Sequence, residues 1–135
     1  MPQLYAIDPK QLDVFWGAAL PFVKTAMETS AYDTPADVYA AIKEDRAILW
    51  LVYNGSEIKA VCVTQLSETA KAKTCSIWIM TGSGREDWQH MLDDIEAFAR
   101  REGCTHMRHN ARPGWAKILK PQGYTMTHVI LEKAL

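Results

Sequence analysis

The sequence predicts one α/β domain, with a mixed and mostly antiparallel sheet of about six strands and helices on both of its faces. Three observations predict this class. Long segments repeat apolar residues at three- and four-residue steps, the period of an amphipathic helix. Shorter runs between them are rich in β-branched and aromatic residues, as strands are. The length, 135 residues of which 48% are hydrophobic, suits a single domain over residues 1–135.

The first third of the chain predicts a short strand and two helices. Residues 4–7 form the strand candidate, and Asp8-Pro9 can open a helix. Residues 11–28 carry apolar side chains along one helical face, and Pro21 within them should kink or divide that helix. Thr34-Pro35 combines an N-cap residue with a first-turn proline, which predicts a second helix through about residue 45.

The middle of the chain predicts three consecutive antiparallel strands. Residues 47–53, with the sequence AILWLVY, form a continuous apolar run, as expected of a strand covered on both faces. Asn54-Gly55 follows it and is the pair that best supplies the two positive φ angles of a tight type I′ turn. Strands at residues 58–66 and 75–80 continue the meander.

The last third begins with helical spacing. Apolar residues between positions 88 and 99 line one side of a long helix, which Gly103 ends. Residues 105–110 are predicted as a strand, residues 115–119 as a short helix and residues 126–131 as the last strand. The predicted order is therefore strand, two helices, three strands, long helix, strand, short helix, strand.

Charge and hydropathy restrict the classes of partner. The chain has 15 basic and 16 acidic residues and a net charge of -1, so we expect neither nucleic acid nor a membrane as a partner. The longest apolar run is far too short to cross a bilayer, and residues 1–10 lack a signal-peptide pattern. We expect a cytoplasmic protein, and a homodimer is compatible with this sequence.

Cysteine and histidine usage predicts neither disulfides nor a metal. The three cysteines, Cys62, Cys75 and Cys104, are an odd number in apolar, strand-like surroundings, which favours reduced and buried thiols. The four histidines lack the spacing of a zinc site. His106 and His109 should point to opposite faces of their strand because side chains alternate there. We expect no metal cofactor.

A glycine-containing turn before the long helix is the strongest candidate for a binding site. A helix begins with unpaired N–H groups and the positive end of its dipole, so an anion gains hydrogen bonds and a favourable field there. Glycine allows the main chain to approach such an anion closely. The alternative is a capping box between Ser83 and Glu86, which would satisfy the helix end without a ligand. The turn comprises Thr81, Gly82, Ser83, Gly84, Arg85 and Glu86.

This order of elements, together with the glycine turn, Arg112-Pro113-Gly114-Trp115 and Gly123-Tyr124, resembles the GNAT superfamily of N-acetyltransferases. The resemblance implies acetyl-CoA, or another acyl-CoA, as cosubstrate. Residues 81–86 would hold its diphosphate, and the strand that contains Ile79 and Met80 would lie beside its pantetheine arm. Asn110 and Arg112 would flank the gap between two strands. The ending also resembles small GNAT-like proteins encoded by phages and prophages.

Two positions depart from the pattern of that superfamily. Ile79 stands where the phosphate motif has Gln or Arg. Leu119 stands where a tyrosine usually serves as the general acid that reprotonates the thiolate of coenzyme A. The fold can therefore persist without catalysis.

The predicted function is acyl transfer from acyl-CoA to an amine of a small molecule or a protein, by direct attack in a ternary complex. The candidate catalytic residues are Glu68, His109 and Tyr124. Each has a plainer interpretation, as a solvated loop carboxylate, a structural strand histidine and a packed ring respectively. Two other functions stay open. One is a binding module without catalysis, which could be a structural component of a phage, and the other is a sensor that binds acyl-CoA without turnover.

Overall fold

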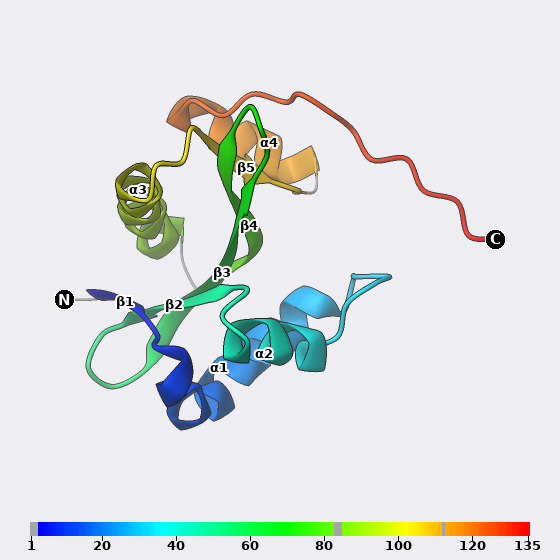
Figure 1. Ribbon diagram of the computed structural model, residues 1–135. Helices are drawn as coiled ribbons and strands as arrows, with labels where there is room; N and C mark the ends of the chain where they lie inside the picture. Colours follow the sequence, from blue (N-terminus) through cyan, green and yellow to red (C-terminus); the bar gives the residue numbers. More distant parts are fainter. Residues whose placement is uncertain (1–2, 83–84, 112) are drawn as a thin grey trace.

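The computed structural model describes residues 3–82, 85–111 and 113–135 and has one five-stranded sheet between two layers of helices (Figure 1). The side chains of residues 85–88 and 113 are outside that description. The strands are β1 Gln3–Ala6, β2 Ile48–Tyr53, β3 Ile58–Glu68, β4 Lys73–Gly82 and β5 His106–His109. The helices are α1 Leu12–Met27, α2 Pro35–Lys43, α3 Arg85–Arg101 and α4 Pro113–Leu119, with 3-10 turns η1 Pro9–Gln11 and η2 Lys120–Gln122.

The sheet is mixed and mostly antiparallel, as predicted. Its order is β1-β2-β3-β4-β5, the first four strands pair antiparallel, and β5 lies parallel to β4. The chain reaches β5 through α3, since a parallel neighbour needs a crossover connection.

Each face of the sheet has its own apolar core, because side chains alternate along β2 and β3. On the face of α1 and α2, Leu49 and Leu51 of β2 pack with residues of those helices such as Val23 and Ile42. On the opposite face, Trp50 and Val52 pack with the side chains of α3, and Leu119 of α4 joins them. The continuous apolar run in β2 is therefore explained by helices on both faces, as predicted.

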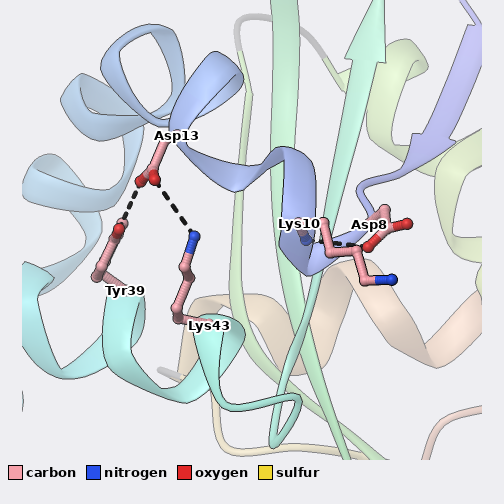
Figure 2. A network of polar contacts seen from close by, with 5 residues as sticks. All are labelled: Asp8, Lys10, Asp13, Tyr39 and Lys43. Carbon is pink, nitrogen blue, oxygen red and sulfur yellow. Dashed lines mark hydrogen bonds and ion pairs between the residues drawn. The ribbon is translucent and has the colours of Figure 1, made fainter.

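Polar side chains cap the second helix and connect it to the first. Thr34 and Asp37 form a capping box at the start of α2. Asp13 of α1 accepts hydrogen bonds from the Tyr39 hydroxyl and, at 3.2 Å, from Nζ of Lys43 on α2 (Figure 2). Of the two predicted effects of Pro21, a kink or a division, the division does not occur, since α1 continues from Leu12 to Met27. Its buried face against the sheet stabilises the helix despite the missing N–H of the proline.

The turn between β2 and β3 is wider than predicted. Four residues, 54–57, separate the strands, and Gly55 has a φ of 96° while Asn54 does not have a positive φ. Asn54 instead uses its side chain, since its Oδ1 accepts from the backbone N–H groups of Ser56 and Glu57. The expected type I′ turn was therefore wrong, because an Asx-type turn satisfies these backbone groups equally well.

The sixth strand, predicted at residues 126–131, is absent from the described structure. The sheet has five strands, and residues 125–135 follow η2 as an extended segment without a strand partner. A run rich in β-branched and apolar residues forms a strand only where a neighbour supplies backbone hydrogen bonds, and none pairs with this segment in the described chain. Among the described residues, no helix has the length and hydrophobicity needed to cross a membrane.

Candidate functional site

The candidate site lies where β4 and β5 diverge. The two strands pair from Thr74↔His106 to Ile77↔His109, and β5 then ends. Strand β4 continues to Gly82, so its residues 78–82 have no strand beside them on the β5 side within the described chain. Among the described residues, no strand therefore pairs with the backbone groups on this side of residues 78–82.

A β-bulge in β4 coincides with this divergence. Val63 of β3 pairs with Ile79 and Thr64 pairs with Ile77, so Trp78 is an extra residue on β4. The bulge interrupts the alternation of side chains, and Trp78 and Ile79 both pack on the side of α1 and α2. Bulges bend strands, so this one explains locally why β4 leaves the direction of β5.

A cleft of about 630 Å³ occupies the opening between the two strands. One wall is β4 and the other is the end of β5 with the residues that follow it. Six of the predicted site residues line this cleft, namely Ile79, Met80, Thr81, Gly82, His109 and Asn110. The start of α3 at Arg85 follows Gly82 closely along the chain. Ser83, Gly84, Arg112 and the side chains of Arg85 and Glu86 lie outside the described residues.

The predicted glycine turn begins later than expected. Thr81 and Gly82 belong to β4 and pair with Val61 and Ala60, so they were wrongly assigned to a loop. A Cβ on Gly82 would lie 2.8 Å from Cβ of Ala60 and 3.1 Å from the Lys59 carbonyl oxygen. The close approach to β3 therefore requires glycine at position 82 whether or not a ligand binds.

A second hollow of about 530 Å³ adjoins the cleft on the α2 side. Asp33, Gln65, Trp78 and Asn110 line both spaces, so the two share a wall. The second hollow also has Asp37, Ala40 and Arg46 in its wall. Sequence reasoning missed this hollow, because Gln65 and Asp33 come from distant segments and only the sheet register brings them together.

His109 is the titratable side chain of the predicted set that lies in the cleft wall. Its Nδ1 is buried and has no hydrogen-bond partner among the described residues. Burial lowers the pKa of His109 from 6.5 to about 4, so the imidazole is neutral at neutral pH. The ring stacks obliquely on Trp115 of α4, with centroids 5.4 Å apart. A neutral imidazole with a free ring nitrogen can accept a proton.

Tyr124 lies in the core on the α3 side. Its hydroxyl donates a hydrogen bond of 2.8 Å to Oε2 of Glu96, and its ring packs against the apolar cluster below α3. Burial raises the pKa of Tyr124, and the bond to Glu96 raises it further. Tyr124 is not among the described residues that line the cleft.

Glu68 lies away from the cleft. It is exposed at the last pair of the β3–β4 hairpin, opposite Lys73, whereas the opening between β4 and β5 begins beyond Ile77. The structure therefore brings His109 together with the predicted donor-site residues and leaves Glu68 and Tyr124 outside that group. No cluster of three or more His, Cys, Asp or Glu side chains suited to a metal occurs among the described residues.

Comparison with known proteins identifies the fold. No known protein-family model and no curated protein match this sequence. An acetyltransferase from Trypanosoma brucei aligns over 100% of both chains, with a TM-score of 0.77 and 10% identity. A predicted acetyltransferase from Clostridium acetobutylicum, solved with acetyl-CoA, aligns over 99% of this chain and 96% of its own, with a TM-score of 0.74 and 14% identity.

A third neighbour is an aminoglycoside acetyltransferase from an uncultured soil metagenomic sample. It aligns over 99% of this chain and 96% of its own, with a TM-score of 0.76 and 9% identity. At such identities the similarity concerns the fold. The chain has the GNAT fold that its order of elements led us to expect.

Proposed function

We propose that this protein is an acyl-CoA-dependent N-acyltransferase. The observation that carries the proposal is the opening between β4 and β5, where no strand of the described chain pairs with residues 78–82 and where β4 and His109 line one cleft. A narrow arm that bears amides, such as pantetheine, can pair with strand backbone in such an opening. The GNAT fold of the chain supports the same interpretation.

The diphosphate of the donor would lie at the start of α3. The first N–H groups of a helix have no intrahelical partners. The positive end of the helix dipole adds to their attraction for an anion, and α3 is a regular helix of 17 residues. Residues 81–86 would hold the diphosphate, with Arg85 adding a charge-assisted contact. Asn110 and Arg112 would flank the arm from the β5 side.

In the proposed reaction, the nitrogen of a primary amine attacks the carbonyl carbon of the thioester. The C–N bond forms, the C–S bond breaks, and the sulfur leaves as a thiolate that takes a proton from solvent. His109 would accept the proton from the amine nitrogen, because its imidazole lines the cleft and is neutral at neutral pH. Backbone N–H groups of β4 would polarise the carbonyl.

The acceptor would enter through the second hollow. Asp33 and Asp37 lie in its wall beside Trp78, and carboxylates with an aromatic face favour a cationic amine. Arg46 is also in that wall, but it is paired with Glu44. Because the two spaces adjoin at Gln65 and Asn110, an amine bound there would lie next to the donor.

The test is a titration with acetyl-CoA and with coenzyme A, in which binding is measured by calorimetry and by the shift in melting temperature. Ligand at about 100 times its dissociation constant should stabilise the fold by roughly 2.7 kcal/mol, which a melting curve resolves. Gly84→Trp should weaken binding by obstructing the approach to the helix start. Release of free thiol with a panel of amines would then establish transfer. Absence of any shift at millimolar ligand would reject the proposal.

The departures at Ile79 and Leu119 favour a second candidate, a GNAT-like protein without catalysis. Both side chains are buried in apolar clusters, so neither position supplies polar chemistry. Such a protein could be a binding module, including a structural component of a phage, or a sensor of acyl-CoA. Binding without thiol release for any amine would support the sensor, and no binding would support the module.

A further inference from the structure

The extended segment after η2 presents two chemically different sides. Side chains alternate in extended backbone, so Ile130 and Glu132 point one way while Val129 and Leu131 point the other. The contacts agree with this alternation. Ile130 lines the cleft between β4 and β5, and Glu132 accepts a hydrogen bond of 2.6 Å from the Tyr32 hydroxyl. Neither Val129 nor Leu131 lines that cleft.

Tyr32 belongs to the connection between α1 and α2, which forms another part of the same cleft wall. Ser30 and Asp33 of that connection also line the cleft, and Oγ of Ser30 accepts hydrogen bonds from the backbone N–H groups of Tyr32 and Asp33. Figure 1 shows the segment leaving the α3 and α4 side and extending past that connection. The bond between Tyr32 and Glu132 therefore joins two parts of the cleft rim that are 100 residues apart in sequence.

We propose that the C-terminal segment is a wall of the donor cleft, fastened by the Tyr32–Glu132 hydrogen bond, and that Ile130 contacts the bound acyl-pantetheine arm. This inference rests on the proposed function. It adds Ile130 as a binding residue and Tyr32 with Glu132 as a fastening pair. All three lie outside the glycine turn and outside β4 and β5.

The exposure of Ile130 supports this role. The side chain is 67% exposed although it borders the cleft, so a ligand that fills the cleft can cover part of its apolar surface. An arm bound along β4 would cover that surface, and burial of apolar area is favourable. Val129 is 70% exposed but lies outside the cleft lining, which makes it a matched control.

Calorimetry with coenzyme A and acetyl-CoA on four full-length variants tests the inference. Ile130→Ala should raise the dissociation constant by about threefold to tenfold, as expected when the ligand buries roughly one to two methylene equivalents of that side chain. Val129→Ala should leave it unchanged. Tyr32→Phe and Glu132→Gln should each raise the dissociation constant about twofold to fivefold by weakening the fastening. Equal effects of the two alanine variants, or tighter binding by Ile130→Ala, would overturn the inference.

A readout without ligand separates failure of this inference from failure of the proposed function. If the wild-type protein does not bind coenzyme A, the proposed function fails. Backbone NMR relaxation still tests the fastening in that case. The order parameters of residues 126–131 should be lower in Tyr32→Phe than in the wild type, and should keep the wild-type values in Tyr5→Phe, since the Tyr5 hydroxyl bonds to Gln3 instead. Equal order parameters in the wild type and Tyr32→Phe would overturn the fastening.

Discussion

Gly82 and Ala60 face each other across β4 and β3 so closely that position 82 has no room for a side chain. A Cβ placed on Gly82 would lie 2.8 Å from Cβ of Ala60, well inside van der Waals contact. This contact fixes the last pair of the β3–β4 ladder directly before α3 begins. The pair therefore determines where the polypeptide leaves the sheet and where the N-terminus of α3 lies relative to the cleft.

We predict that Gly82→Ala destabilises the protein by about 1–3 kcal/mol, because the backbone of β3 must shift to admit the methyl group. Urea denaturation measures this difference. The double variant Gly82→Ala/Ala60→Gly should recover part of the loss, since it removes the nearest clashing atom. A double variant no more stable than Gly82→Ala would show that the strain arises elsewhere, with the Lys59 carbonyl as the other near neighbour.

The sequence predicted those elements whose signals are local. The helical period, the Thr34 cap and the continuous apolar run of β2 each correspond to an observed element. The errors concern choices that distant partners decide. Asn54 could satisfy its turn in two ways, and residues 126–131 have a strand-like composition but no adjacent strand in the described structure. Propensity describes a segment alone, whereas strand formation requires a neighbour.

The variant Tyr124→Phe distinguishes a structural role of Tyr124 in the core from a catalytic role of its hydroxyl. The hydroxyl donates to Glu96, whose side chain is mostly buried, so its removal leaves a carboxylate oxygen without that donor. We expect a loss of about 1–2 kcal/mol in unfolding free energy, measured by denaturation. Acyl transfer assayed well below the melting temperature should persist, because the hydroxyl lies outside the cleft lining. A collapse of kcat with normal stability would instead assign the hydroxyl to the chemistry.

Thr64 is the buried polar residue among those described, and its hydroxyl oxygen accepts a hydrogen bond of 2.9 Å from Nε1 of Trp50. We predict that Thr64→Val destabilises the protein by about 1–3 kcal/mol, because the shape is kept while a buried indole N–H loses its partner. Thr64→Ser retains the hydroxyl and should cost about 1 kcal/mol for the missing methyl group. Thermal denaturation ranks the two variants, and the reverse order would show that packing outweighs the hydrogen bond.

The candidate site was only partly predictable, for a physical reason. His109 and Asn110 could be placed by the strand that ends there, and Met80 by the strand that precedes the glycine turn. Trp78 could not, since the bulge that turns it toward α1 and α2 depends on the register against Val63 and Thr64. The contribution of Ile130 and Tyr32 depends on where an unpaired segment lies, which no local pattern specifies.

The stability of the protein should fall in acid because of His109. Folding lowers the pKa of His109 from 6.5 to about 4, so between those values the unfolded chain binds the additional proton. Stability therefore rises with pH across this window and is complete above it. At pH 5 the free energy of unfolding should be about 2 kcal/mol lower than at pH 8 because of this imidazole.

Denaturant titrations of wild type and His109→Gln at both pH values should show a smaller difference in the variant. His106→Gln, at an exposed position three residues earlier on β5, is the control and should keep the wild-type slope. An identical pH dependence for His109→Gln and the wild type would mean that His109 is not held neutral, and would remove the base from the proposed mechanism.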